Sequence, residues 1–182
     1  MDPDWVQVKE AFGEFYNPDF KYKRCGQHLL QLKVTSTTKT NESRNHVVDA
    51  RFAKFRASEL FVLRIYDSHQ NRFIKKLDHS FVNISYCRIF IRYKVGTIVY
   101  PNGFNEDLNV VCGQGIHYFN TLLGAFHYRN NHQKNIYFNE CGAIEHIYWE
   151  KFQNWHWYYD NKSTAVKWIQ KNYGLLDPVF CT

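Results

Sequence analysis

The amino-acid sequence predicts an α+β protein that is mainly β, with antiparallel sheets, one or two short helices and a C-terminal β-meander. Two observations lead to this fold class. Residues 80–100 form a long run of β-branched and aromatic side chains, which are typical of strands. Residues 140–174 contain a weak internal repeat with the spacing of a hairpin. Helical periodicity is confined to short segments, so the helices are expected to pack on the sheets.

The composition favours a single folded domain over residues 1–182. Hydrophobic residues make up 45% of the chain and aromatic residues 18%, so the chain can bury a sizeable core and is not mainly disordered. Within this domain we expect a core that carries the distinctive motifs over residues 19–134. A tail of degenerate hairpin repeats is expected to follow over residues 135–174.

The N-terminal segment combines one helix pattern with one strand pattern. Val8, Phe12, Phe15 and Tyr16 recur at helical spacing, which predicts a short helix that ends before Pro18. Residues 28–38 alternate in polarity and are rich in β-branched side chains, so they predict a strand. The polar residues 37–45 predict an exposed loop.

Strand patterns dominate the middle of the chain. Residues 51–68 predict a half-buried strand, which the turn-forming residues 67–71 follow. Residues 80–100 predict two strands, between which Gly96 can form a bulge or a turn. The helix pattern at residues 121–129 can begin with either Asn120 or Thr121 as its N-cap, because both side chains can accept a backbone hydrogen bond.

The C-terminal third allows two interpretations. Residues 140–152 align with residues 162–174 at an offset of 22 residues, which favours a meander of hairpin units. Alternatively, residues 164–173 form a helix, with Ser163 as the N-cap and Gly174 as the C-cap.

Charge and length restrict the possible partners. The formal net charge is +6, but the basic residues are scattered among acidic ones, with local concentrations only at residues 20–24 and 88–94. Nucleic acid is therefore an unlikely partner, and solvation of the surface explains the charge. No apolar stretch approaches ~20 residues, so we expect no membrane span.

The cysteines indicate a reducing compartment. Their number is odd and their spacing contains no CxxC pair, which fits free thiols better than a disulfide framework. The N-terminus contains acidic residues and no apolar signal core, so the chain is not expected to be secreted. The five cysteines are Cys25, Cys87, Cys112, Cys141 and Cys181.

Two stretches of the sequence resemble a known family. AKFRASELFVLRIYDS (residues 53–68) and YKVGTIVYPNGFNEDLNVVCGQGIHYFNTLLGAFHYR (residues 93–129) are similar to an uncharacterised domain carried by many proteins of large nucleocytoplasmic DNA viruses. The tail over residues 138–169 resembles a decayed pair of MORN-like repeats, although Lys162 stands where such a repeat has a glycine. The resemblance implies a viral origin and a compact β-rich fold, but no chemistry.

The segment CGQGIHYF (residues 112–119) is the most distinctive stretch. We interpret it as a structural motif, whose glycines allow a tight turn before a strand. An alternative remains open, because the segment and the helix after it resemble the strand and helix that hold the nicotinamide end of NAD in ADP-ribosyltransferases. The candidate catalytic acids would then be Glu140, Glu145 and Glu150. The structural motif comprises Cys112, Gly113, Gly115, His117 and Tyr118.

The sequence predicts no metal, no cofactor and no catalytic residue. His117, His127, His132 and His146 could in principle join Cys112 or Cys141 around a metal, but zinc ligands usually come in close pairs such as CxxC or HxxxH. The patterns of serine hydrolases, P-loop proteins and dinucleotide-binding folds are absent from the sequence.

The aromatic cluster WHWYY (residues 155–159) is the best candidate for contact with a partner. In a strand, Trp155, Trp157 and Tyr159 would share one face, and an exposed aromatic face more often marks a protein interface than a nucleic-acid platform. The sequence thus favours a non-enzymatic structural or protein-interaction component of a large DNA virus, such as a minor capsid or other virion protein. Its partners would be other proteins, above all viral capsid or virion proteins, and its location the host cell cytoplasm or the virion.

Overall fold

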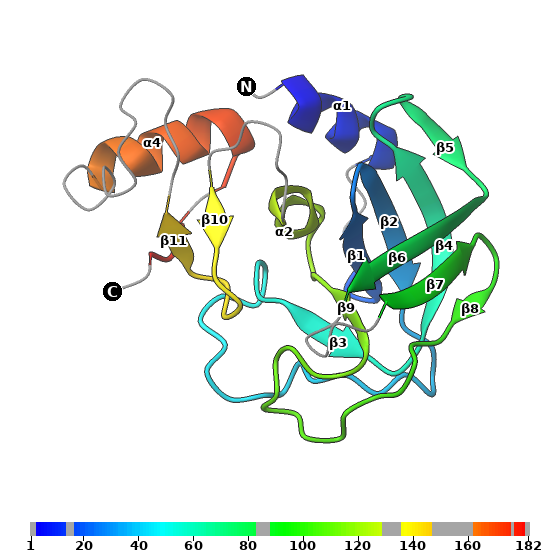
Figure 1. Ribbon diagram of the computed structural model, residues 1–182. Coiled ribbons are helices and arrows are strands. Elements are labelled where there is room, and N and C mark those ends of the chain that lie inside the picture. Colours follow the sequence, from blue (N-terminus) through cyan, green and yellow to red (C-terminus); the bar gives the residue numbers. More distant parts are fainter. Residues whose placement is uncertain are drawn as a thin grey trace.

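An antiparallel sheet of five strands forms the frame of the structure (Figure 1). The strands are β1 (Phe20–Cys25), β2 (His28–Lys33), β4 (Leu60–Asp67), β5 (Arg72–Ile74) and β8 (Ile98–Val99). They are hydrogen-bonded in the order β1-β2-β4-β5, and β8 pairs with the first residues of β4. The computed structural model describes residues 3–13, 17–82, 88–128, 136–146, 162–175 and 177–180.

The described residues also form three two-stranded antiparallel sheets. They are β3 (Phe55–Ala57) with β9 (Ile116–Tyr118), β6 (Lys76–Val82) with β7 (Arg88–Lys94), and β10 (Tyr137–Phe138) with β11 (Ile144–His146). Tyr22 of β1 and Phe119 exchange two backbone hydrogen bonds, of 2.8 and 2.7 Å. These bonds tie the end of β9 to the edge of the main sheet.

The described residues also form three helices, α1 (Pro3–Phe12), α2 (Leu122–His127) and α4 (Lys162–Tyr173). Thr121 is the N-cap of α2, because its hydroxyl accepts a hydrogen bond from the Gly124 amide at 3.1 Å. Of the two N-caps expected from the sequence, Thr121 is therefore correct. In the described ranges, no helix has the length and apolar character required to cross a membrane.

Two hydrophobic clusters lie on opposite faces of the main sheet. Successive residues of a strand point to opposite faces, so Leu29 of β2 joins one cluster and Leu30 joins the other. The first cluster contains side chains from α1, α2 and α4, such as Trp5, Phe126 and Ile169. The second contains side chains from β3, β7 and β9, such as Phe55, Tyr93 and Tyr118.

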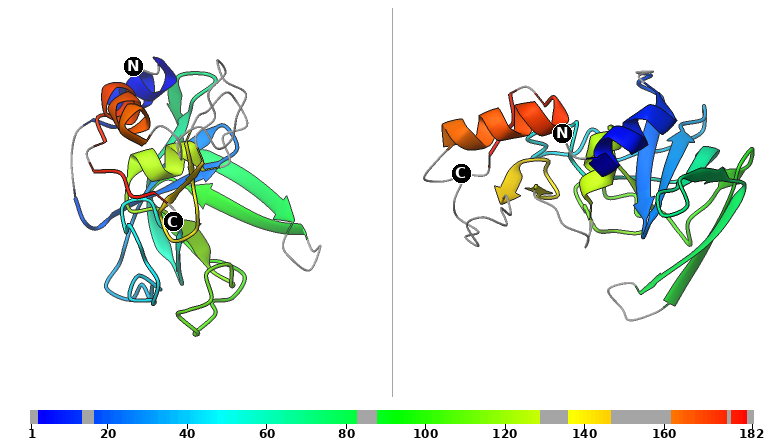
Figure 2. Two further views of the ribbon diagram at one scale, coloured as in Figure 1. Left: turned by 90° about the vertical axis from the view of Figure 1, so that its left-hand side faces the viewer. Right: turned by 90° about the horizontal axis from the view of Figure 1, so that it is seen from above.

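The hairpin of β6 and β7 projects from this body (Figure 2). Its base is anchored in the second cluster, where Ile91 is 6% exposed and Tyr93 is fully buried. Phe90, by contrast, is 70% exposed on the opposite face of β7. The hairpin therefore joins the core through one face and leaves the other open to solvent.

The fold class expected from the sequence is confirmed, since antiparallel strands dominate and the helices are short. The last strand of the expected meander is wrong, because residues 162–173 are helical and the alternative interpretation holds. Ala165, Ile169 and Tyr173 lie four residues apart and are all buried, which is the periodicity of a helix face. Gly174 follows the helix with φ +66°, as expected of a C-cap. Strand β1 is an element that the sequence did not predict.

Candidate functional site

The motif around Cys112 lies in the loop that leads into β9. Ile116 and Tyr118 are buried, His117 is partly buried between them, and Cys112 is exposed. Strand β9 pairs with β3 through Arg56 opposite His117 and Ala57 opposite Ile116. The two stretches that carry the family resemblance therefore meet in this β3–β9 pair.

Arg56 holds the loop before β9 in place. Its side chain is fully buried and lies over the Phe104 ring, with 5.0 Å between the guanidinium carbon and the ring centroid. The guanidinium donates hydrogen bonds to the carbonyl oxygens of Val110, at 2.7 Å, and Gln114, at 3.2 Å. It also donates to the carbonyl oxygens of Asn105 and Asp107. One buried side chain thus satisfies four carbonyl groups of residues 105–114, which no regular strand or helix would satisfy.

The two glycines of the motif sit where a larger residue would meet close neighbours. Gly115 has φ +146°, and an added Cβ would lie 3.1 Å from Cβ of Arg56 and 3.2 Å from the Ala57 oxygen. A Cβ on Gly113 would lie 3.0 Å from side-chain atoms of Asn105 and Val110. Gly115 has the positive φ expected from the sequence, whereas Gly113 is restricted by the close approach of these side chains.

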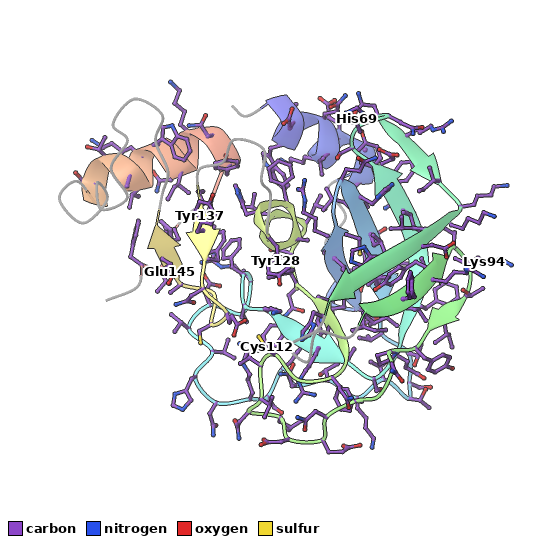
Figure 3. The ribbon with its side chains drawn as sticks, in the orientation of Figure 1. His69, Lys94, Cys112, Tyr128, Tyr137 and Glu145 are labelled. Carbon is purple, nitrogen blue, oxygen red and sulfur yellow. The ribbon has the colours of Figure 1, made fainter. Side chains whose placement is uncertain are left out.

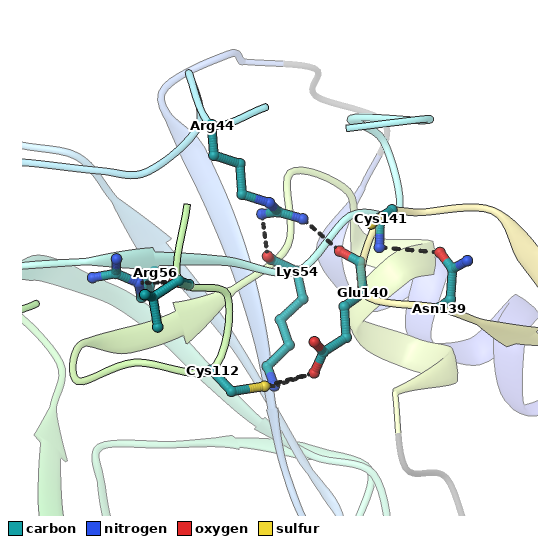
Figure 4. Close-up of polar contacts among 8 residues, drawn as sticks. Arg44, Lys54, Arg56, Cys112, Asn139, Glu140 and Cys141 are labelled. Carbon is teal, nitrogen blue, oxygen red and sulfur yellow. Dashed lines mark hydrogen bonds and ion pairs between the residues drawn. The ribbon is translucent and has the colours of Figure 1, made fainter. Parts of the chain in front are cut away.

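Cys112, Lys54 and Glu140 form a polar cluster beside the loop (Figure 4). The Cys112 thiol donates to Glu140 Oε1 at 2.7 Å, and Lys54 Nζ lies 3.4 Å from Cys112 Sγ. Lys54 Nζ also lies 3.3 Å from Glu140 Oε1, so each of the three groups contacts the other two. The side chains come from the segment before β3, the loop before β9 and the turn between β10 and β11.

The contacts in this cluster stabilise the charged forms of Lys54 and Glu140 and the neutral form of Cys112. Burial opposes the charge of Lys54, but Tyr128, Cys112 and Glu140 outweigh this effect and raise its pKa. Burial and the hydrogen bond to Glu140 raise the pKa of the Cys112 thiol, so the thiol is protonated at neutral pH. Burial would raise the pKa of Glu140, yet the bond from Cys112 and the charge of Lys54 lower it.

Arg44 fixes two members of this cluster through their backbones. Its guanidinium donates to the Lys54 carbonyl oxygen at 2.7 Å and to the Glu140 carbonyl oxygen at 2.6 Å (Figure 4). The side chain is 5% exposed and also lies over the Phe55 ring. The distance between the segment before β3 and the β10–β11 turn is therefore set by a buried ionic group.

His117 is surrounded by positive charge. Burial, and after it the positive charges of Lys54, Lys23 and Arg56, lower its pKa from 6.5 to about 3, although a hydrogen bond to the Val111 backbone acts in the opposite direction. Among the described residues its Nε2 atom is buried without a hydrogen-bond partner. The imidazole is thus neutral over the physiological pH range.

Tyr118 belongs to a second buried polar group. Its hydroxyl donates to Glu42 Oε1 at 2.5 Å, and Lys21 Nζ lies 2.8 Å from the same oxygen. Burial raises the pKa of Tyr118 far above its usual range, and the negative charge of Glu42 is the second largest cause of this shift. Tyr118 therefore stays protonated and connects β9 to the loop that contains Glu42.

The outward face of the β6–β7 hairpin forms a separate polar surface. Cross-strand pairing places Lys76 opposite Lys94 and Asp78 opposite Arg92, and Phe90 shares their face of the hairpin. Arg92 Nε lies 2.6 Å from Asp78 Oδ1, and both side chains are exposed. In Figure 3, Lys94 lies at one edge of the molecule and Glu145 lies on the opposite side. We call the exposed side chains Lys76, Asp78, Phe90, Arg92 and Lys94 the hairpin face.

Several residues singled out in the sequence lie outside the described part of the chain. Trp155, Trp157 and Tyr159 are among them, as are Glu150 and His132. Their expected roles stay predictions. Within the described ranges, no group of three or more His, Cys, Asp or Glu side chains could hold a metal ion.

Sequence reasoning missed most partners of the motif. Glu140 was considered only as a possible catalytic acid, and Lys54, Arg56 and Glu42 were not considered at all. A usable signal for Lys54 and Arg56 existed, because both belong to the AKFRA stretch that carries the resemblance. The spacing alone could not reveal that this stretch pairs with residues 116–118.

Comparison with known proteins gives a family and no activity. The family model of DUF5758, described as a family of unknown function, matches residues 7–125, which is more than half of the chain. No curated protein and no solved structure matches the chain. The matched range includes the C-terminal part of α1, the main sheet, the loop held by Arg56 and most of α2. The chain therefore belongs to DUF5758, a family of unknown function.

Proposed function

We propose that the protein is a non-enzymatic interaction component of a large DNA virus, acting as a minor capsid or other virion protein. The observation that carries the interaction part is the hairpin face, where Phe90 is 70% exposed on a strand pair that projects from the body. Exposed aromatic side chains flanked by positive charge are common in protein interfaces. The viral part rests on the resemblance of residues 53–68 and 93–129 to domains of such viruses.

The charge of the hairpin face indicates the kind of partner. Lys76, Arg92 and Lys94 contribute three positive charges, against the single negative charge of Asp78. Ile98 of β8 and the neighbouring Tyr100, which follow the hairpin in the chain, are also exposed, at 40% and 61%. The chemistry fits an acidic protein segment with at least one apolar side chain that packs on Phe90.

The ADP-ribosyltransferase alternative receives less support from the geometry. Glu140 already contacts Cys112 and Lys54, so its carboxylate is engaged by these two side chains. A Cβ added to Gly113 or Gly115 would lie within 3.3 Å of neighbouring atoms, so the space beside both glycines is filled by protein. A rise in the melting temperature with NAD, together with transfer of labelled ADP-ribose, would revive this alternative.

Proteomics of purified particles and cross-linking test the proposal together. The chain is expected in particles of the virus that encodes it, with lysine cross-links from Lys76 and Lys94 to an acidic viral protein. The substitution Phe90→Ser should abolish these cross-links, whereas Val48→Ser, at another exposed apolar residue, should leave them intact. Absence from the particles would refute the virion role, and equal cross-linking by Phe90→Ser would refute the hairpin face as the contact.

A further inference from the structure

The Cys112–Lys54–Glu140 cluster combines three features that the interaction role does not use. The Cys112 thiol is exposed, so a small oxidant can reach its sulfur from solvent. The Lys54 side chain is only 9% exposed, and its Nζ lies 3.4 Å from that sulfur. Glu140 Oε1 lies within hydrogen-bond distance of both groups and can move protons between them.

We propose that Cys112 and Lys54 form a redox-sensitive modification site, in which hydrogen peroxide drives formation of a covalent Sγ–Nζ bond. The product is a sulfenamide between the two side chains. A neighbouring nitrogen can trap an oxidised cysteine in this way before further oxidation occurs. The short distance between Sγ and Nζ makes the trapping reaction intramolecular and therefore fast relative to reaction with a second molecule.

In the first step the sulfur is oxidised. Glu140 accepts the thiol proton across the 2.7 Å hydrogen bond as the sulfur attacks one oxygen of the peroxide, so that no free thiolate forms. The O–O bond breaks, and the leaving hydroxide takes the proton from Glu140 to become water. The peroxide is reduced, and Cys112 becomes a sulfenic acid.

In the second step the S–N bond forms without further oxidation. The Lys54 ammonium gives one proton to Glu140, and the free amine attacks Sγ of the sulfenic acid. The S–O bond breaks, the leaving hydroxide takes the proton from Glu140, and the second amine proton passes to solvent. One thiol, one ammonium ion and one peroxide thus give one sulfenamide, two waters and one proton.

The surrounding structure keeps the reacting groups together. Arg44 holds the backbones of Lys54 and Glu140, and Arg56 holds the loop that carries Cys112. Cys25 and Cys141 differ from Cys112 in this respect. Cys25 is buried, and no lysine contacts the Cys141 thiol among the described residues. Cys112 is therefore the described thiol that is both accessible and next to an amine.

Peptide mapping after peroxide treatment tests the proposal on the full-length protein. A cross-linked peptide pair that joins residues 54 and 112 and lacks two hydrogens is expected, and dithiothreitol should remove the link. Cys112→Ser should abolish the link, while Cys141→Ser, one residue from Glu140, should retain it. Cys112 recovered as a sulfinic or sulfonic acid beside an unmodified Lys54 would overturn the proposal.

Two further variants separate chemistry from folding. Lys54→Arg keeps the positive charge but removes the amine, so Cys112 should be trapped as a sulfenic acid by dimedone. If this variant fails to fold, Glu140→Gln replaces it, because the amide keeps the shape of Glu140 but cannot accept a proton. Link formation in Glu140→Gln should be at least about tenfold slower than in the unsubstituted protein. An equal rate would refute the role of Glu140 in the proposed reaction.

Discussion

Acidification should destabilise the protein through His117 well before most carboxylates are protonated. The folded state holds the His117 pKa at about 3, whereas the ordinary value, which applies to the unfolded chain, is 6.5. A group with a depressed pKa stabilises the folded state above its unfolded value and loses that contribution as the pH falls. The pH window of this effect therefore runs from 6.5 down to about 3.

The size of the effect follows from the difference between the two pKa values. Each pH unit below the unfolded pKa removes about 1.4 kcal/mol from the free energy of unfolding, because only the unfolded chain takes up the proton. Lowering the pH from neutral to about 5 should therefore cost about 2 kcal/mol through His117 alone. Lys54, Lys23 and Arg56 lie near the ring, and among the described residues no carboxylate contributes to the shift in its pKa.

Denaturant unfolding at a series of pH values measures this effect directly. The variant His117→Gln cannot take up a proton, and it keeps the same carboxylates as the unsubstituted protein. The difference in unfolding free energy between the two proteins should change by about 2 kcal/mol between neutral pH and about pH 5. Parallel pH profiles for both proteins, or a His117 ring signal in NMR that titrates near its ordinary pKa, would refute this reasoning.

Four substitutions test other features of the fold. Arg56→Met should lower the free energy of unfolding by about 3 kcal/mol, because the carbonyl oxygens of Asn105 and Val110 lose the hydrogen bonds that the buried guanidinium donates. Gly142→Ala should cost a similar amount, about 3 kcal/mol, since its Cβ would lie 2.0 Å from the Asp49 oxygen. Gly26→Ala, at a positive φ with open space, should cost only about 1 kcal/mol. Phe90→Ser should change stability by less than about 0.5 kcal/mol, because the ring is mainly exposed. Chemical denaturation measures all four variants.

Each of these predictions has an outcome that contradicts it. An Arg56→Met protein as stable as the parent would show that water can replace the guanidinium at the loop carbonyls. Equal losses for Gly142→Ala and Gly26→Ala would mean that backbone conformation alone, and not the contact with Asp49, determines the cost. A large loss for Phe90→Ser would place the ring in the core.

The fold class and most helices and strands could be predicted from the sequence, because the spacing of hydrophobic residues shows which face of a helix or strand is buried. The N-cap residue Thr121 and the C-cap residue Gly174 marked helix ends through local backbone chemistry. Strand β1 was missed because its alternating lysines suggested a solvated surface. In the structure Lys21 is buried by its contact with Glu42, which lies far away in the sequence. The sequence pattern around a residue cannot show that its side chain is buried when the burial depends on a partner far away in the sequence.

The candidate site was harder to predict for the same reason. Cys112 and His117 stood out because they lie in an unusual segment, but their chemistry depends on Lys54 and Glu140. These residues come from three segments that only the β3–β9 pairing and the Arg44 contacts bring together. An isolated sequence gives no distance between them.

The way in which Arg56 binds the 105–114 loop has a consequence for how this family can diversify. The guanidinium recognises main-chain oxygens, and every amino acid supplies such an oxygen. Substitutions at the outward positions Glu106 and Leu108 can therefore accumulate without releasing the loop from its guanidinium anchor. Relatives that keep the arginine can present different chemistry on this surface over an unchanged main-chain path.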